Sequence, residues 1–401
     1  MSSIDISHSC RRKQAKNNTF TSRSWWLKAS TASTLVTNHS VPCKTFDQTY
    51  HPSHDLYVIG ITGTNGKTTV AHLIGKALES AGYKPFVLGT LNSGSRDLFI
   101  PEPRDILAFM TEHLKQGGTH FVMEVTSEGI DQSRILGVDF DLKILTNITH
   151  DHLDYHKTFE IYRKVKLGFM TEGLAHAIYP DDFHSEIINY TTQLMGDFNV
   201  LNIKAASVAL RHIGIAENTI CDSLSSCLPP RGRLESVENG QPFLVLIDYA
   251  HTPDGLENVL KTAKKMAVAR KGKLLVLFGC GGNRDCEKRP KMGRIASALA
   301  DHVVITNDNP RLENPSNIIS EIVCGLPIGF KSFTVLEDRK SAIQFIVDQT
   351  EDRDVVILAG KGHETYQILA TETIHFDDRE EAMNALFIRS KSVVASTLSI
   401  Q

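Results

Sequence analysis

The chain lacks several of the features that mark specialised classes of protein. Its seven cysteines form no C-x-x-C pair and show no metal-ligand spacing: Cys10, Cys43, Cys221, Cys227, Cys280, Cys286 and Cys324. An odd number of dispersed thiols suits a reducing cytoplasm better than a disulfide scaffold. No apolar run reaches the roughly 18 residues that a membrane-spanning helix needs. The formal net charge of −3 gives no electrostatic reason to expect a nucleic acid or a membrane surface as a partner. These absences predict a cytoplasmic protein without a membrane span.

The composition sets the size and number of domains. With 401 residues and 41% hydrophobic content, the chain has room for two or three domains, each with its own core. Residues 1–50 differ from the rest, because up to Lys44 they are rich in Ser, Thr and Asn and carry one acid, Asp5, among many basic residues. Such a segment buries too little apolar surface to fold alone, so we predict a polar tail. The same composition is typical of an organelle transit peptide, and a misassigned start also stays open.

From Asp55 onward, short apolar runs alternate with amphipathic stretches. The runs read as buried parallel strands: Leu56–Ile59, Phe86–Leu88, Thr119–Val125 and Leu142–Thr146, then Phe243–Ile247, Lys273–Phe278, His302–Thr306 and Val355–Ala359. The stretches Val70–Leu78 and Ile106–Leu114 have helical spacing. The alternation predicts an α/β fold with two parts. We expect a doubly wound, phosphate-loop central domain at residues 51–228, followed by a Rossmann-like α/β domain at residues 229–401.

The stretch Gly60–Thr69 lies between a predicted strand and a predicted helix, as a phosphate-binding loop does. Three glycines are expected to bend the backbone so that consecutive N–H groups face phosphate oxygens: Gly60, Gly63 and Gly66. Lys67 would reach the terminal phosphates, and the hydroxyl of Thr68 would ligate Mg²⁺. Ile61 stands where the general pattern G-x-x-x-x-G-K-[ST] has its first glycine. A tight turn with an incidental lysine is the plainer alternative.

Acidic and imidazole side chains follow two of the predicted strands. Glu124 ends a run that should be a central strand, where ligands of open α/β sheets bind, and a carboxylate there suits Mg²⁺. A helix-capping or rim-exposed glutamate is the alternative. The segment His150–His156 holds three His and two Asp. Zinc is one interpretation of that cluster. Because no Cys accompanies it and the phosphate loop favours magnesium, we assign one His to Mg²⁺.

Six ordered motifs together resemble the Mur ligases, the ATP-dependent amide-bond-forming enzymes of peptidoglycan precursor synthesis. They are Gly60–Thr69, Glu124–Ser127, Asp151–His156, Gly196–Asn202, Gly232–Glu235 and Asp248–Pro253. The offset glycine of the phosphate loop is this family's own version. Four further motifs resemble the MurE type, which adds the third amino acid of the peptide: Gly279–Asp285, Lys288–Pro290, Asp308–Arg311 and Gly360–Glu364. The resemblance covers residues 55 to 390.

The resemblance implies ATP and Mg²⁺ as cofactors. The residues implied in ATP binding are Gly63, Thr64, Asn65, Gly66, Lys67, Thr68, Thr69, Asn199, Asn202, Arg233 and Asp248. One Mg²⁺ would lie on Thr68 and Glu124, and a second on His152 and Lys166, the latter as a carbamylated lysine. The residues implied in catalysis are Lys67, His152, Lys166 and Arg233. An ordinary surface lysine is the alternative for Lys166, and a helix cap is the alternative for the Asn and Arg residues.

The resemblance also implies the substrates and the reaction. The form Asp308-Asn309-Pro310-Arg311 is typical of enzymes that add meso-diaminopimelate, whose extra carboxylate a guanidinium binds well. The implied substrate residues are Thr126, Ser127, Arg134, Arg284, Asp308, Asn309, Pro310, Arg311, Gly360 and Glu364. The carboxylate of UDP-muramoyl-dipeptide would become an acyl phosphate, which the amine of diaminopimelate then attacks. Arg311 as a simple surface ion-pair partner is the alternative.

The sequence departs from the family pattern in four places. Relatives usually open with a nucleotide-sugar domain of about ninety residues, a typical small domain, whereas only the polar tail precedes the loop here. Pro101–Pro103 replaces a Thr-Thr-Pro motif, Glu128 replaces a His, and the segment between Lys166 and Gly196 is short. Three interpretations therefore stay open. They are a reduced MurE-type ligase that uses a partner or a relaxed nucleotide site, a related ligase for another carboxylate, and a non-catalytic structural or regulatory protein.

Overall fold

A computed structural model describes residues 51–91 and 101–398, with side chains through residue 391. The predicted polar tail and its transit-peptide alternative lie outside these described residues. Among the described helices, none combines the length and apolar character needed to cross a membrane. The five cysteines in the described ranges are all free thiols.

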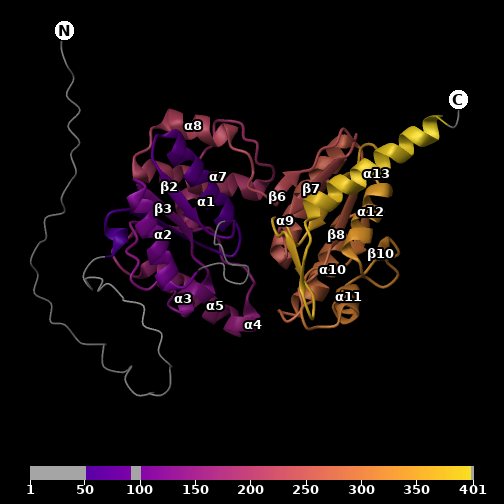
Figure 1. The fold of residues 1–401 in the computed structure, drawn as a ribbon, viewed down its shortest axis with the longest axis horizontal. Helices are drawn as coiled ribbons and strands as arrows, with labels where there is room; N and C mark the ends of the chain where they lie inside the picture. Colours follow the sequence, from indigo (N-terminus) through magenta and orange to yellow (C-terminus); the bar gives the residue numbers. More distant parts are fainter. Residues whose placement is uncertain (1–50, 92–100, 399–401) are drawn as a thin grey trace, which may run out of the picture. The chain divides into compact units, whose positions relative to one another are not determined.

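The first sheet has five strands, all parallel, in the order β2-β3-β1-β4-β5 (Figure 1). The strands are β1 (Tyr57–Thr62), β2 (Pro85–Leu88), β3 (His120–Glu124), β4 (Leu142–Leu145) and β5 (His176–Ile178). Alternate residues of β1 enter two different cores, because Ile59 packs on one face of the sheet and Val58 on the other. The sheet is therefore covered on both faces, which explains why its strands read as continuous apolar runs.

Helices form the two covering layers of this sheet. On the Ile59 face lie α1 (Lys67–Ser80), α6 (Pro180–His184), α7 (Asp197–Ile213) and α8 (Glu217–Ser226). The other face carries α2 (Pro103–Lys115), α3 (Ser127–Asp131) and α5 (Phe159–Thr171). The short helices η1 (Pro52–His54) and α4 (Leu153–His156) complete this part of the chain.

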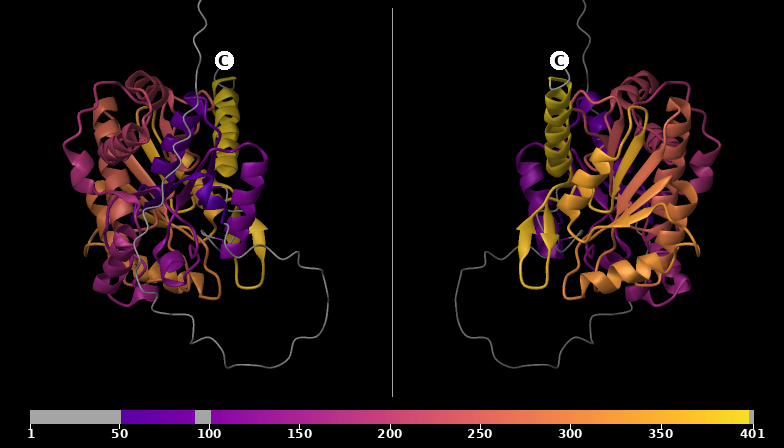
Figure 2. Two further views of the ribbon diagram at one scale, coloured as in Figure 1. Left: turned by 90° about the vertical axis from the view of Figure 1, so that its left-hand side faces the viewer. Right: turned by 90° about the vertical axis from the view of Figure 1, so that its right-hand side faces the viewer.

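The second sheet has six strands in the order β10-β9-β8-β11-β7-β6. Its strands are β6 (Arg233–Ser236), β7 (Leu244–Asp248), β8 (Leu274–Phe278), β9 (His302–Ile305), β10 (Phe333–Val335) and β11 (Val355–Ala359). All neighbours pair in parallel except β6, which runs antiparallel to β7 along one edge. The sheet is covered by α9 (Pro253–Arg270), α10 (Lys288–Leu299) and α11 (Pro315–Val323) on one face, and by α12 (Arg339–Asp348) and α13 (Asp378–Leu398) on the other. A hairpin of β12 (Tyr366–Ile368) and β13 (Thr373–His375) stands apart from it, drawn in yellow in Figure 2.

The predicted fold class is confirmed, since the chain is α/β with one parallel and one mixed sheet. Each predicted strand is present, and its bounds agree within two residues except that β1 continues three residues past Ile59, to Thr62. Five strands were not predicted: β5, β6, β10, β12 and β13. They are three or four residues long and largely half-buried or exposed, so they carry no continuous apolar run. The proposed boundary between residues 228 and 229 falls in the connection between α8 and β6, and stays a prediction.

Candidate active site

The turn between β1 and α1 can be built only with glycine at two positions. Gly63 has φ +147° and Gly66 has φ +86°, conformations that residues with a Cβ rarely adopt. A Cβ at Gly63 would lie 1.9 Å from Oγ1 of Thr146, and one at Gly66 would lie 2.3 Å from Oδ1 of Asn202. The loop therefore lies in close contact with Thr146, the residue after β4, and with Asn202 on α7. This geometry brings its backbone to the N-terminus of α1, where N–H groups are free to face an anion.

The prediction that Gly60 bends the phosphate loop was wrong. Gly60 does not bend the loop but lies inside β1. A Cβ there would lie 2.6 Å from the ring of Phe140 and 2.8 Å from that of Phe169, whose rings meet edge to face. Gly60 thus allows two aromatic side chains to pack against the strand.

Lys67, the first residue of α1, folds back over the loop. Its Nζ donates hydrogen bonds of 2.9 Å to the carbonyl oxygens of both Gly63 and Thr64. Burial lowers the pKa of Lys67, whereas the nearby carboxylate of Glu124 raises it. The ammonium is thereby held at the mouth of the loop, where the terminal phosphates of a nucleotide would lie.

The predicted pair of oxygen ligands is present at the carboxyl end of β3. Oγ1 of Thr68 donates a 2.9 Å hydrogen bond to Oε2 of Glu124. Thr90 donates to the same carboxylate from its hydroxyl, at 3.0 Å, and from its backbone N–H, at 2.8 Å. A hydroxyl and a carboxylate at this edge suit a hard cation such as Mg²⁺. Within residues 51–91 and 101–391, no group of three or more His, Cys, Asp or Glu side chains could by itself hold a metal, so a cation would also need phosphate oxygens.

His152 lies between two carboxylates. Its backbone has φ +54° at the start of α4. Nδ1 lies 2.7 Å from Oε1 of Glu128, and Nε2 lies 3.2 Å from Oδ2 of Asp151. Although burial lowers the pKa of His152, these two carboxylates raise it overall. The neighbouring histidines His150 and His156 each have a buried Nε2 that has no hydrogen-bond partner among the described residues.

Lys166 on α5 is buried, with 1% of its surface exposed, so the interpretation as an ordinary surface lysine was wrong. Its Nζ donates to the carbonyl of Gly63 at 3.0 Å and to Oγ1 of Thr62 at 3.3 Å. Burial, followed by the charge of Lys67, lowers the pKa of Lys166 well below its ordinary value. A neutral amine is the form that reacts with carbon dioxide, so the site fits carbamylation.

Residues of the second sheet reach the phosphate loop. Nη2 of Arg233 donates to Oγ1 of Thr68 at 3.2 Å, and the guanidinium lies 4.7 Å from the ring centre of Tyr249. Nε of Arg233 is buried and has no hydrogen-bond partner among the described residues. Asp248, paired with Arg233 in the sheet register, accepts two backbone N–H bonds of 2.8 Å, and burial raises its pKa to about 6. An arginine and an acid therefore face the loop from β6 and β7.

A cavity of about 130 Å³ lies between these groups. The predicted residues that line it are Thr64, Asn65, Gly66, Lys67, Thr68, Thr69, Glu124, Thr126, His152, Asn202, Arg233 and Asp248. Asn65 is also bonded across it, because its Nδ2 donates to Oδ2 of Asp254 on α9 at 2.6 Å. Asn199 does not line the cavity. It is buried behind Asn202, which donates to its Oδ1 at 3.0 Å.

A second cavity, of about 480 Å³, holds most of the predicted substrate residues: Thr126, Arg134, Arg284, Asp308, Asn309, Arg311, Gly360 and Glu364. Ser127 and Pro310 do not line it. Arg311 has φ +54°, and its Nη1 donates to the carbonyl of Gly282 at 3.0 Å. The guanidinium is only partly buried and makes no ion pair within the described residues, so the alternative of a simple surface ion pair has no support.

The acids of the second cavity are held by neighbouring groups. Nδ2 of Asn309 donates to Oε2 of Glu364 at 2.9 Å, and Nζ of Lys361 donates to Oδ1 of Asn309 at 3.1 Å. A Cβ at Gly360 would lie 2.6 Å from Oδ2 of Asp308, so glycine is needed for Asp308 to lie there. This network fixes the orientation of Asn309 and Glu364 toward the cavity.

The two cavities adjoin, because five residues line both: Thr126, Asp151, His152, Tyr249 and His251. Tyr249, His251 and Lys288 were not predicted as site residues, although they lie in motifs that the sequence made visible. Tyr249 and His251 belong to the segment Asp248–Pro253, and Lys288 begins the Lys-Arg-Pro motif. Sequence alone gave no sign of which of these side chains would face the cavity.

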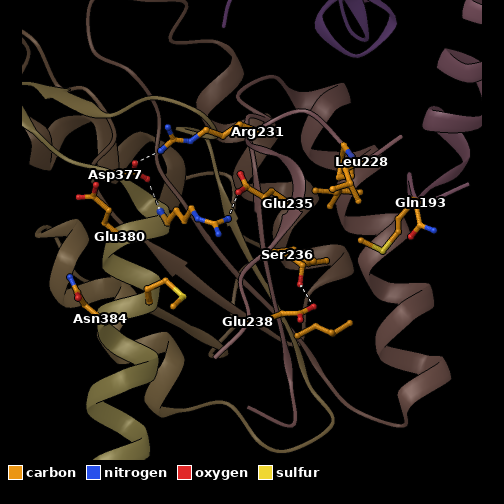
Figure 3. Close-up of a pocket in the computed structure, with 16 residues that line it drawn as sticks. Gln193, Leu228, Arg231, Glu235, Ser236, Glu238, Asp377, Glu380 and Asn384 are labelled. Atoms are coloured by element: carbon orange, nitrogen blue, oxygen red, sulfur yellow. Dashed lines mark hydrogen bonds and ion pairs between the residues drawn. The ribbon is translucent and has the colours of Figure 1, made fainter. Parts of the chain in front are cut away.

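A still larger cavity, of about 1290 Å³, lies beside β6 and the start of α13 (Figure 3). None of the predicted site residues lines it. Its charged groups largely satisfy one another, because Arg231 pairs with Asp377 and Arg379 pairs with Glu235. Size alone therefore does not mark the active site here.

These features define a nucleotide-binding enzyme of the phosphate-loop class. They are a glycine loop before a helix, a carboxylate on the neighbouring strand, and an arginine from a second sheet. A family model described as "Mur ligase middle domain" matches residues 61–184, and one described as "Mur ligase, glutamate ligase domain" matches residues 232–362. The chain belongs to the Mur ligase family and is an ATP-dependent ligase of that family, as the motifs predicted.

Individual relatives agree with this assignment. The chain is 37% identical to the UDP-N-acetylmuramoyl-L-alanyl-D-glutamate--2,6-diaminopimelate ligase of Bacillus cereus, over 84% of this chain and 79% of that protein. It is 38% identical to the ligase of the same name from Thermosynechococcus vestitus, over 85% and 79%. A solved structure of such a diaminopimelate ligase has 29% identity and a TM-score of 0.54, covering 84% of this chain and 79% of that one. A structure titled "E.coli FolC in complex with DHPP and ADP" shares the fold at 17% identity, with a TM-score of 0.59 over 85% and 91%.

Proposed function

We propose that the chain joins meso-diaminopimelate to the terminal carboxylate of UDP-N-acetylmuramoyl-dipeptide, using ATP and passing through an acyl phosphate. The observation that carries this proposal is the pair of adjoining cavities. One is lined by the phosphate loop, and the other is lined by Arg284, Asn309 and Arg311. Relatives at 37% identity are named for this reaction, which supports the choice of substrates.

In the first step the γ-phosphoryl group passes from ATP to a carboxylate oxygen. A new oxygen–phosphorus bond forms, the bond to the β-phosphate bridge breaks, and ADP leaves. Because both reactants are anions, the step needs positive charge, which Lys67 and Arg233 supply beside Thr68. The Thr68 and Glu124 oxygens, and His152 with a carbamylated Lys166, would hold Mg²⁺, which when bound neutralises phosphate charge.

In the second step the amine of diaminopimelate attacks the acyl carbon. The carbon–nitrogen bond forms, the carbon–oxygen bond to phosphate breaks, and the amine loses a proton. Arg311 and Arg284 line the same cavity and would bind the distal carboxylate, which lysine lacks. Glu364, held by Asn309, would accept from the ammonium group next to that carboxylate. The opposite charges of the carboxylate and the ammonium group of diaminopimelate explain why the cavity holds both arginines and a glutamate.

On the other side of the cavity, Thr126 and Arg134 would contact the muramoyl-dipeptide and its diphosphate, with Ser127 behind them. A partner protein that adds contacts to the nucleotide sugar remains part of the proposal. We place the reaction in the cytoplasm, the reducing compartment that the free cysteines suit.

The proposal is tested by offering the full chain ATP, Mg²⁺, UDP-muramoyl-dipeptide and either diaminopimelate or lysine, with mass spectrometry as the readout. The expected product is the diaminopimelate tripeptide, formed only with ATP and absent for Lys67→Ala. Phosphate release with a different carboxylate acceptor, and none with this one, would favour a ligase of other specificity. Absence of phosphate release with every acceptor would instead indicate a non-catalytic protein.

A further inference from the structure

Lys288 is a buried cation in the substrate cavity. It is the first residue of α10, directly after the glycine-containing loop that follows β8, and it is 8% exposed. It lines the 480 Å³ cavity together with Arg134, Arg284 and Arg311, and among these four it alone is buried. Within the described residues, no group accepts a hydrogen bond from Nζ of Lys288. This nitrogen is not completely enclosed by protein, so a ligand in the cavity can reach it.

The next residue, Arg289, is also a buried cation, but its charge is fully paired within the protein. Arg289 is fully buried, and its guanidinium is bonded to Glu313 at 2.6 Å, to Glu321 at 2.8 Å and to the carbonyl of Gly281 at 3.2 Å. Arg289 thus ties α10 to its surroundings. Lys288 has no such hydrogen bonds and makes no ion pair within the described residues, and the carboxylate of Asp151, which lines the same cavity, acts on it only from a distance.

The charge of Lys288 acts on two residues that line both cavities, Asp151 and His251. Burial, followed by the charge of Lys288, lowers the pKa of His251 to about 4. Burial raises the pKa of Asp151, whereas His152, His251 and then Lys288 lower it overall. Both neighbours line the two cavities at their junction. Lys288 thus shares the larger cavity with Asp151 and His251, which also line the nucleotide cavity, whereas Nη1 of Arg311 is directed to the carbonyl of Gly282.

We propose that Lys288 binds the carboxylate of the acceptor substrate at the junction of the two cavities and stabilises the negative charge of its acyl phosphate. This inference rests on the proposed function and adds a catalytic residue to it. An ammonium is suited to this role because it donates to carboxylate and phosphate oxygens without a fixed fork geometry. The carboxylate would reach Lys288 on one side and the γ-phosphate, bound near Lys67 and Arg233, on the other.

The test uses the full chain with Lys288→Met, Lys288→Arg and, as control, Lys291→Met, an exposed lysine on the same helix. Each is assayed for ligation, and hydroxylamine is added without diaminopimelate to trap acyl phosphate as a hydroxamate. We expect Lys288→Met to lower kcat and hydroxamate yield about 100-fold or more, the size seen when one charge stabiliser is removed. Lys288→Arg should recover part of both, and Lys291→Met should match the wild type. Binding of a non-hydrolysable ATP analogue should change less than about twofold, a shift below 0.5 kcal/mol.

Each contrary result has a distinct meaning. Wild-type hydroxamate yield in Lys288→Met would overturn the inference while leaving the ligase intact. A raised KM for diaminopimelate alone, with normal hydroxamate formation, would assign Lys288 to the amino-acid side and also overturn it. If the wild-type chain makes neither hydroxamate nor amide, the proposed function itself fails, and Lys288 loses its role with it. Thermal unfolding of each variant shows whether a loss of activity reflects misfolding. If Lys288→Met does not fold, the inference is judged on Lys288→Arg, whose full loss of hydroxamate formation in a folded protein would contradict the expected partial recovery.

Discussion

Oε1 of Glu128 lies 2.7 Å from Nδ1 of His152. A carboxylate that accepts the Nδ1 proton fixes the imidazole tautomer and directs Nε2 to the place where a cation would bind. Oδ2 of Asp151 lies 3.2 Å from that Nε2 and could share the same ion. Glu128 thus orients the histidine that the proposal assigns to the second divalent site.

Replacing Glu128 by Gln should therefore weaken the second divalent site. We expect the affinity for the weaker of two Mn²⁺ ions to fall about 10-fold to 100-fold, as for other carboxylates that orient a ligating histidine. The measurement is Mn²⁺ titration followed by electron paramagnetic resonance, with a non-hydrolysable ATP analogue present. Glu79→Gln, an exposed residue paired with Lys76, is the control. Equal Mn²⁺ affinity in Glu128→Gln and wild type would show that His152 needs no such orientation.

Lys166 should carry a carbamate. With ¹³C-bicarbonate, the wild type is expected to show a carbamate carbonyl signal by NMR, because burial lowers the pKa of Lys166 and so favours the neutral amine that reacts with carbon dioxide. Lys166→Arg should lose this signal, and ligation should fall about 100-fold or more, in line with removal of a charge-stabilising ligand. Lys164→Arg, two residues away on the exposed side of α5, should keep both. A carbamate signal that persists in Lys166→Arg would assign it to another amine.

Arg311→Ala should affect diaminopimelate far more than ATP. Loss of a guanidinium–carboxylate contact should lower kcat/KM for diaminopimelate about 100-fold, which corresponds to roughly 3 kcal/mol. Binding of an ATP analogue, measured by calorimetry, should stay within about twofold. Arg294→Ala, exposed on α10, is the matched control. Equal ligation in Arg311→Ala and wild type would refute the assignment, and an equal loss of ATP binding would point to a folding defect.

His120 should make the fold sensitive to acid. It lies on β3, 4.6 Å from the ring of Tyr83 and 5.5 Å from that of Tyr57, and burial lowers its pKa to about 4. In the unfolded chain its pKa is about 6.5. Between these values the unfolded state binds more protons, so the free energy of unfolding falls as the pH drops from about 6.5 toward 4.

His120→Phe keeps the ring contacts and removes the titrating group. The loss of stability between pH 7 and pH 5, measured by urea unfolding, should therefore shrink by up to about 2 kcal/mol. His184→Gln, an exposed histidine at the end of α6, should leave that pH dependence as in the wild type. An unchanged pH dependence in His120→Phe would mean that the pKa of His120 is the same in the native and unfolded states.

Much of this protein was readable from the sequence because its signals are local. Strands buried on both faces, such as β3 and β11, are continuous apolar runs, and the bend at Gly63 and Gly66 follows from glycine chemistry within one turn. Thr68 and Glu124 were expected to meet because the carboxyl ends of neighbouring parallel strands share one sheet edge, and they do, at 2.9 Å. Motif order along the chain was enough to predict the family.

Only the tertiary structure decided which side chains face one another across elements distant in sequence. Nothing local indicates that Gly60 makes room for Phe140, that Lys166 is buried against the phosphate loop, or that Asn199 lies behind Asn202. The direction of Lys288 into the cavity, beside an Arg289 that is fully bonded, is likewise absent from the sequence. Periodicity fixes the face of an element, whereas burial, charge pairing and open space depend on the packing of several elements at once.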